Sequence, residues 1–261
     1  MISKYSWEKV VKNNKALYLI KNKETGIDEL STLFLKDMTL RNCSENTIMW
    51  SAKVMTFYLD YLRVLHLTPP EVIDLDYSKQ LEHFSSYLDY VKLGRNKKEV
   101  KNNTANSYLQ KVLIFYRFLH RTKNYPDLKI YDYKECHYAS SVGTVVSTSV
   151  STYSGYYQPN SNEYTIPSVS DIRRVLDACR SNRDKLLFTL MAETGIRIGE
   201  ALGVRYPDDI DIEKRRIFIR YRSNNENNVF AKYAEERTVT FSPYTAHLLN
   251  AYISENAEFF F

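Results

Sequence analysis

The sequence predicts a mostly α fold with a small antiparallel sheet, divided between a helical first half and a mixed second half. In the first half, apolar residues recur at near-helical spacing in several segments. After Pro207 the pattern changes to alternation, and residues 216–221 (RIFIRY) read as a strand. Between the halves, residues 139–154 are rich in Ser, Thr and Val, which predicts a linker or an irregular exposed segment. The alternating valines there are also compatible with a short edge strand.

Length and composition are those of a globular protein. The 261 residues suffice for one large domain or two ordinary ones, and 44% of them are hydrophobic. There is no run of about 18 apolar residues, and the lysine-rich N-terminus lacks the apolar core of a signal peptide. We therefore expect a cytoplasmic protein with no membrane partner.

The cysteines and histidines show no ligand pattern. Cys43, Cys136 and Cys179 are scattered and odd in number, which argues against a disulfide framework or a zinc module. The five histidines have no metal-ligand spacing, and His137 beside Cys136 has no second pair to complete a site. No metal and no cofactor are expected.

Four helices are expected in the first half. They fall at about residues 28–40, 44–65, 81–91 and 104–119. Ser44 is a good N-cap for the second helix, which Pro69 and Pro70 are expected to end. Gly94 suits the C-terminal end of the third helix. Four short helices in succession predict a compact bundle.

The second half is expected to combine helices with a three-stranded antiparallel sheet. Helices are predicted through residues 172–176, 185–193 and 246–253, and strands at residues 216–221, 229–232 and 238–241. Ser168 or Ser170 caps the first of these helices. The helix at residues 185–193 is almost wholly apolar, so we expect it to be buried on most faces.

The segment from Glu193 to Leu202 (ETGIRIGEAL) contains the strongest chemical signal in the chain. It places Arg197 just after Gly195 and just inside a new helix, with Glu200 three positions on. Helix N-termini attract anions, and arginine adds two-pronged hydrogen bonding to phosphate oxygens. The alternative is a structural Arg197–Glu200 pair, worth only a few tenths of a kcal/mol.

This motif and the order of the elements resemble those of tyrosine recombinases of the phage-integrase family, including members carried by transposons. The resemblance covers most of the sequence. It implies a four-helix core-binding (SAM-like) domain at residues 26–125, which binds DNA from one side, after an N-terminal extension at residues 1–25. It further implies a linker at residues 126–163 and the N-terminal portion of an α+β catalytic domain at residues 164–261.

Three catalytic positions are carried over from the resemblance. Arg197 matches the arginine that grips the scissile phosphate, and Glu200 matches the acidic position that supports the site. Lys232 matches the hairpin lysine that protonates the leaving 5′-oxygen, because it lies five residues before Arg237 and a following strand. The family more often has glycines around this lysine, and a solvated hairpin charge is the alternative role for Lys232.

The sequence departs from the family in its last part. The family also needs a second arginine in a His-x-x-Arg motif, a further His or Trp, and a tyrosine nucleophile near the C-terminus. After Lys232 the only histidine is His247, with no arginine at the required place. We therefore read the sequence as C-terminally truncated and expect that this chain alone does not cleave DNA.

Three functions remain open at this stage. The first is a site-specific recombinase, integrase or transposase, whose complete form breaks and rejoins DNA through a 3′-phosphotyrosyl intermediate without a cofactor. The second is a catalytically incompetent, truncated relative that binds DNA and occupies recombination sites. The third is a helical protein-interaction module with no DNA role.

Double-stranded DNA is the expected partner under the first two readings. The net charge of +5 permits a polyanionic partner. The expected DNA contacts outside the catalytic motif are Arg95, Lys97, Lys98, Lys101, Lys111 and Arg117. A solvated loop is the alternative for residues 95–101. The resemblance also implies self-association on DNA, as a tetramer in the complete enzyme.

Overall fold

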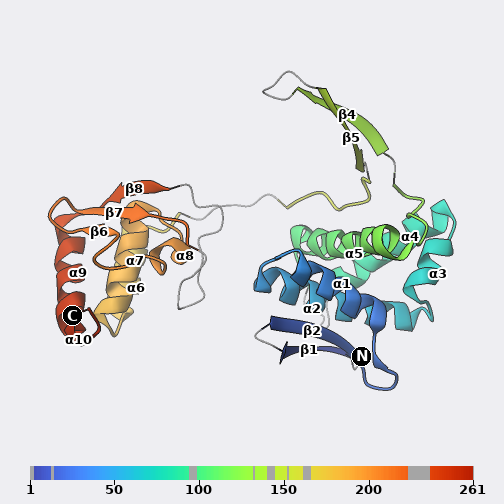
Figure 1. Ribbon diagram of the computed structural model, residues 1–261, viewed down its shortest axis with the longest axis horizontal. Helices are drawn as coiled ribbons and strands as arrows, with labels where there is room; N and C mark the ends of the chain where they lie inside the picture. Colours follow the sequence, from blue (N-terminus) through green and yellow to red (C-terminus); the bar gives the residue numbers. More distant parts are fainter. Residues whose placement is uncertain are drawn as a thin grey trace. The chain divides into compact units, whose positions relative to one another are not determined.

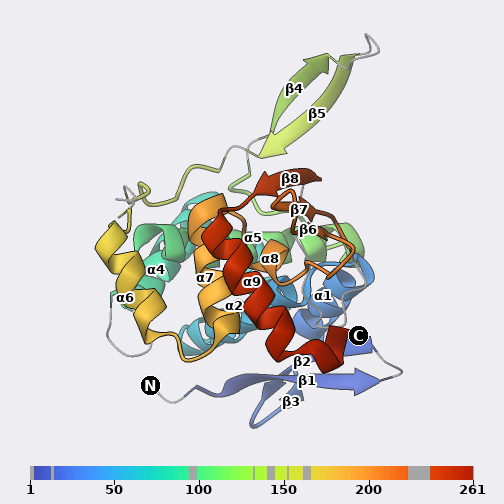
Figure 2. The ribbon, with the colours of Figure 1, turned by 90° about the vertical axis from the view of Figure 1, so that its left-hand side faces the viewer.

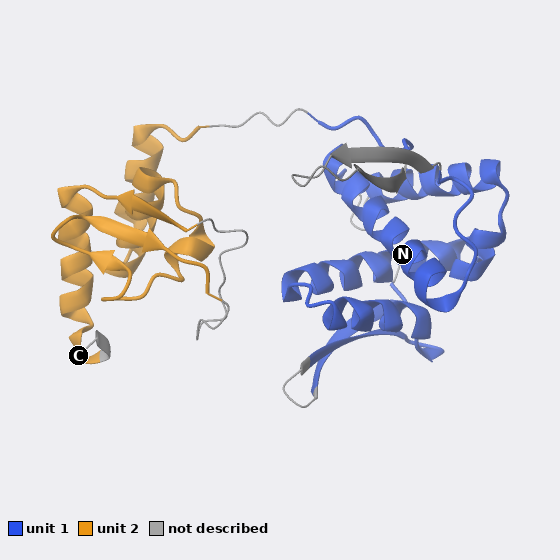
Figure 3. Cartoon of the chain, turned by 45° about the horizontal axis from the view of Figure 1, so that its top comes forward, with its two compact units in different colours: residues 1–162 blue, residues 163–261 orange. Residues whose placement is uncertain are grey.

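The chain forms two compact units, residues 1–162 and residues 163–261 (Figure 3). A computed structural model describes residues 3–12, 15–93, 99–131, 133–139, 145–151, 153–160, 166–222 and 236–260. In these ranges the protein is mostly helical with small antiparallel sheets, which confirms the predicted class. Each unit is described by itself.

The first unit is built on five helices in its described part (Figure 1). They are α1 (Glu29–Leu40), α2 (Glu45–Val64), α3 (Pro69–Asp74), α4 (Tyr77–Leu93) and α5 (Asn102–Lys123). Ser44 caps α2 as predicted, since its side chain accepts a hydrogen bond from the Thr47 backbone N–H. The short helix α3 was not predicted. Pro69 begins it, because proline is tolerated in the first turn of a helix, where its missing N–H is not needed.

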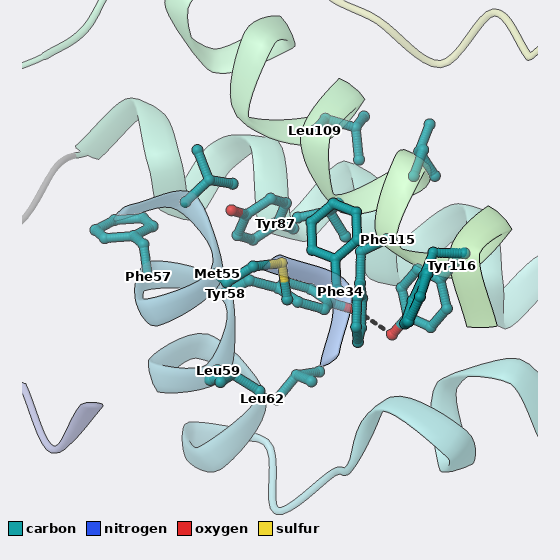
Figure 4. Packing of buried hydrophobic residues seen from close by; sticks show 14 of the residues in the cluster. Phe34, Met55, Phe57, Tyr58, Leu59, Leu62, Tyr87, Leu109, Phe115 and Tyr116 are labelled. Carbon is teal, nitrogen blue, oxygen red and sulfur yellow. Dashed lines mark hydrogen bonds between the residues drawn. The ribbon is translucent and has the colours of Figure 1, made fainter. Parts of the chain in front are cut away.

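Tyrosines fill much of the core of this unit. Tyr58, Tyr87 and Tyr116 are fully buried beside Phe34 and Phe115 (Figure 4). A buried tyrosine needs a partner for its hydroxyl. The Tyr58 hydroxyl meets the Tyr116 hydroxyl at 2.6 Å and Nε2 of His83 at 3.0 Å. Several of the chain's 22 tyrosines thus have a packing role.

The N-terminal residues form a sheet that the sequence did not predict. Strands β1 (Tyr5–Lys12), β2 (Lys15–Asn22) and β3 (Gly26–Ile27) pair in that order. Tyr18 and Ile20 of β2 are buried against α1 and α2, whereas β1 leaves Trp7 and Val11 exposed. With only one strand well buried, the apolar alternation that signals a sheet is weak.

Strands β4 (Tyr133–Ala139) and β5 (Val145–Ser151) form a separate antiparallel pair. The edge strand that the valine pattern allowed is therefore one of two strands in a hairpin. The segment that follows lies against the start of α5. There Asn106 donates its side-chain N–H to the Tyr157 carbonyl at 2.8 Å, and accepts from the Tyr157 N–H at 2.9 Å.

Asn106→Ala should release this segment from α5. Two neutral hydrogen bonds are lost, so the local opening free energy should fall by about 1–2 kcal/mol. Hydrogen exchange of residues 153–160 would measure the change. Asn103→Ala is the matched control, because its one contact to Asn160 is long at 3.5 Å. Equal exchange in the two variants would contradict this prediction.

The second unit places helices against one face of a small sheet (Figures 1 and 2). Its elements are α6 (Val169–Ala178), α7 (Asn182–Thr194), α8 (Ile198–Ala201), β6 (Ile210–Asp211), β7 (Arg216–Ile219), β8 (Arg237–Thr240), α9 (Pro243–Glu255) and α10 (Ala257–Phe260). The sheet order is β6-β7-β8, and α7 packs along α9. The strand predicted at residues 229–232 lies outside the described residues. Ser168 caps α6, one of the two caps that the sequence allowed.

Helix α7 is less buried than its apolar sequence predicts. Leu190 is its one buried residue, and Phe188 remains 44% exposed. Leu186 and Leu187 border a cavity of about 540 Å³ between α7, α9 and the sheet. The prediction of burial on most faces was wrong, because the neighbours of α7 within the described unit cover only part of its surface. Among the described helices, none combines the length and apolarity needed to cross a membrane.

Candidate functional site

The backbone around Arg197 is set by the glycine before it. Gly195 ends α7 with φ of +66°, a left-handed conformation that suits glycine, and the chain then turns to bury Ile196. Arg197 is the N-cap of α8, one position before the helix rather than inside it as predicted. Because α8 has a single turn, the macrodipole contributes little, and the orientation of Arg197 comes from side-chain contacts.

The Glu200 carboxylate holds two arginines. It accepts a hydrogen bond from the Arg197 backbone N–H at 2.9 Å and one from Nη1 of Arg197 at 3.1 Å. Arg237, the first residue of β8, donates to both oxygens in a two-pronged pair at 3.1 and 2.7 Å. The Glu200 side chain is completely shielded from solvent. One buried carboxylate therefore links the turn before α8 to the sheet.

These contacts keep Glu200 ionised. The hydrogen bond from Arg237 is the main cause that lowers the pKa of Glu200 to about 2, and the Arg197 bonds add to it against the opposing effect of burial. The carboxylate thus carries its negative charge at any physiological pH. It serves as a fixed acceptor that anchors two guanidinium groups, and not as a proton donor.

Arg197 is anchored on one side and accessible on the other. Its side chain is 70% exposed, whereas that of Arg237 is 37% exposed. The cluster has one carboxylate and two guanidinium groups, so it carries a net positive charge. A preorientated, accessible guanidinium is suited to hold a phosphate oxygen in two-pronged fashion. The structural pair and the phosphate role of Arg197 are therefore compatible.

Sequence reasoning missed the part that Arg237 takes in this cluster. It used Arg237 only to locate Lys232. The missing information is the strand pairing, in which Arg237 lies opposite Ile219 and so on the side of the sheet that faces the core. The need of Glu200 for a second cation could have pointed to Arg237, because a buried carboxylate must be paired and hydrogen-bonded more fully than one exposed arginine allows.

The other predicted site residues fall into two groups. Lys232, Arg95, Lys97 and Lys98 lie outside the described residues. Lys101, Lys111 and Arg117 belong to α5 or its N-cap. Lys101 and Arg117 are exposed and Lys111 is half-buried. Lys111 and Arg117 are six positions apart, which is about 120° around a helix, so they do not form a single stripe.

Arg117 has a defined orientation. Its guanidinium carbon lies 4.9 Å from the centre of the Tyr131 ring. A guanidinium over an aromatic ring keeps its edge donors available while its face is covered. Arg117 is therefore an exposed cation of the first unit whose guanidinium lies over an aromatic ring.

Comparisons with known proteins agree on one family. Residues 168–261 match the model of the Phage integrase family. Transposase A from transposon Tn554 of Staphylococcus aureus is 26% identical over 257 residues, which cover 92% of this chain and 68% of the transposase. Tyrosine recombinase XerA of Saccharolobus solfataricus is 39% identical over 82 residues, which cover 31% of this chain and 25% of the recombinase.

The chain also has a weak match among solved structures. A crystal structure of XerA recombinase matches with a TM-score of 0.30 and 15% identity, over 88% of this chain and 64% of that chain. The chain thus spans slightly less than two thirds of that recombinase. The family model over residues 168–261 and the similarity to a transposase and to tyrosine recombinases support a member of the tyrosine recombinase family.

Proposed function

We propose that the chain binds DNA and supplies the phosphate-gripping half of a DNA breaking and rejoining site. The observation that carries this proposal is the exposed Arg197 guanidinium held on the buried Glu200 carboxylate. The names of the relatives, a transposase and recombinases, support the same class of reaction. In the complete protein the function is site-specific recombination, integration or transposition.

The chemistry needs a fixed cation at this place. Attack on a phosphodiester builds negative charge on the nonbridging oxygens, and a preorganised guanidinium stabilises that charge without rearranging. Arg197 supplies this group, and Glu200 holds it in position, while Arg237 in turn fixes Glu200. In the complete enzyme a tyrosine would attack and form a 3′-phosphotyrosyl intermediate. That bond stores the energy of the phosphodiester, so rejoining needs no nucleotide cofactor.

Lys232 is the proposed proton donor to the leaving 5′-oxygen. The leaving alkoxide is strongly basic and needs a donor within hydrogen-bond reach. Lys232 lies in the segment between Arg222 and Arg237. Arg237, which follows this segment in the sequence, belongs to the Glu200 cluster at the proposed phosphate site.

The first unit is proposed to contribute phosphate contacts from the end of α4 to α5. These are Arg95, Lys97, Lys98, Lys101, Lys111 and Arg117. Contacts to backbone phosphates position a protein on DNA without reading the sequence. Self-association on two duplexes in the complete enzyme is part of the same proposal.

Salt dependence tests the DNA role. Binding of the purified chain to a short fluorescent duplex should weaken as salt is raised, with log Kd linear in log salt concentration, because phosphate contacts release counterions. A chain that does not bind duplex DNA at low salt, or binds it independently of salt, would contradict the proposal.

Lys97→Glu should weaken this binding for every duplex sequence, by about tenfold if one phosphate contact becomes a repulsion. Lys79→Glu is the matched control, because Lys79 is an exposed residue near the opposite end of α4. Titration of both variants against the same duplexes would measure the difference. Equal affinities would remove Lys97 from the interface.

A further inference from the structure

A second buried carboxylate holds two arginines on the second unit. Asp209, just before β6, is completely buried. It accepts a two-pronged pair from Arg222, with Nη2 of Arg222 at 2.6 Å from Oδ1, and a hydrogen bond from the Arg205 backbone N–H at 2.9 Å. Nε of Arg220 lies 3.5 Å from the same carboxylate as an ion pair.

The two arginines of this cluster differ in what they can still bind. Arg222 is inward: its side chain is 15% exposed and both of its terminal nitrogens face Asp209. Arg220 is outward: its side chain is 48% exposed, and among the described residues its guanidinium donates no hydrogen bond. Arg222 also lies near the carboxylates of Asp208 and Glu236, so the positive charge left over is local to Arg220, which presents its guanidinium to solvent.

The arrangement repeats that of the Arg197 site. There too a buried carboxylate, Glu200, takes a two-pronged pair from an inner arginine and a single side-chain contact from an outer, more exposed one, which at Arg197 is a hydrogen bond. In both clusters the inner guanidinium neutralises the carboxylate and the outer one is surplus. An exposed guanidinium that is anchored by a buried carboxylate but not fully neutralised by it is suited to bind a phosphate.

The two clusters meet at one end of the β7–β8 pair. Arg237 lies opposite Ile219, and Arg220 is the next residue after Ile219. Successive residues of a strand point to opposite faces. Ile219 and Arg237 face the core side, so Arg220 lies on the other side, with its guanidinium 5.9 Å from the ring centre of Phe218. The strand end therefore carries a cation cluster on each face.

We propose that Arg220 is a second phosphate-binding residue, which holds a backbone phosphate of the DNA other than the one at Arg197. This inference rests on the proposed DNA role of the chain. A strand end that enters a groove lies between two phosphate backbones. Cations on both faces of that end can then bind both backbones, which fixes how the duplex lies against the Arg197 site.

Arg220→Gln and Arg216→Gln form the test pair. Both remove one exposed guanidinium from the same strand region, and Arg216 lies at the far end of β7, opposite Thr240. Binding to a short duplex is measured over a series of salt concentrations, together with the thermal midpoint of each variant. Arg220→Gln should raise Kd about tenfold and reduce the magnitude of the salt slope by about 0.9. Arg216→Gln should leave both unchanged.

Arg220→Lys separates binding from folding. It keeps the charge, so it should retain the wild-type salt slope even where the pairing with Asp209 is altered. Salt slopes equal in wild type, Arg220→Gln and Arg216→Gln would overturn the assignment of Arg220 while leaving DNA binding intact. A wild-type chain with no salt-dependent binding would instead overturn the proposed function itself, and Arg220 with it.

Discussion

Glu200→Gln is expected to lower the free energy of unfolding of the second unit by about 3 kcal/mol. Removing one partner of a buried ion pair leaves the other charges uncompensated, which typically costs about 3–5 kcal/mol. In the wild-type chain the guanidinium of Arg237 donates two charge-assisted hydrogen bonds to this carboxylate, and in the variant it would face a neutral amide instead. Arg197 would lose its anchor at the same time, so DNA affinity should fall as well.

The same cluster predicts a pH dependence. The pKa of Glu200 is about 2 in the folded chain, against an ordinary value of 4.5. A lowered pKa in the folded state contributes stability that is present above pH 4.5 and is lost as pH falls toward 2. The amount is roughly 3 kcal/mol. In Glu200→Gln this part of the acid dependence should disappear.

Hydrogen exchange on peptides around Leu190 would follow the second unit alone. Glu213→Gln is the matched control, because Glu213 is exposed in the turn before β7. The free energy of unfolding of the second unit should be about 3 kcal/mol lower in Glu200→Gln than in Glu213→Gln. Glu200→Gln with the stability and acid dependence of Glu213→Gln would show that the carboxylate does not organise the site.

His83→Gln is expected to remove a large acid dependence from the first unit. Burial lowers the pKa of His83 to about 4 from an ordinary value of 6.5. Protonation therefore favours the unfolded chain. The stability is present above pH 6.5 and is lost as pH falls toward 4, by roughly 3 kcal/mol. Within the core the ring nitrogen Nε2 of His83 meets the neutral Tyr58 hydroxyl, and burial disfavours the charged form of the ring.

Tryptophan fluorescence isolates this unit, because Trp7 and Trp50 are the chain's two tryptophans and both lie in it. Urea titrations between pH 7 and pH 4 would give the free energy of unfolding at each pH. His120→Gln, at an exposed histidine, should keep the wild-type acid dependence. If His83→Gln kept it too, another group would be responsible.

The longer helices could be predicted from the sequence, because caps and apolar spacing are local, whereas the short helix α3 could not. Ser44 and Ser168 begin helices where the pattern placed them. The N-terminal sheet could not be predicted, because β1 is mostly exposed and only β2 carries a buried stripe. The partial exposure of α7 was also beyond the sequence, since an apolar run does not say how many neighbours will cover it.

The site was predictable in its local part only. Arg197 and Glu200 are three residues apart, so a motif can specify them. Arg237 is 37 residues from Glu200, and its contact depends on the pairing of β7 with β8. The proposed role of Arg220 likewise depends on its contact with Asp209, whose burial the sequence does not indicate. The role of Lys232 and the α5 contacts stay predictions.

Protection of arginines from phenylglyoxal tests the central claim most directly. In the free chain Arg197 should react readily, because its side chain is 70% exposed. With saturating duplex DNA at low salt, its modification, followed by mass spectrometry, should slow several-fold, while the exposed Arg216 should react at the same rate. Equal modification of Arg197 with and without bound DNA would contradict the assignment of Arg197 as a phosphate-binding residue.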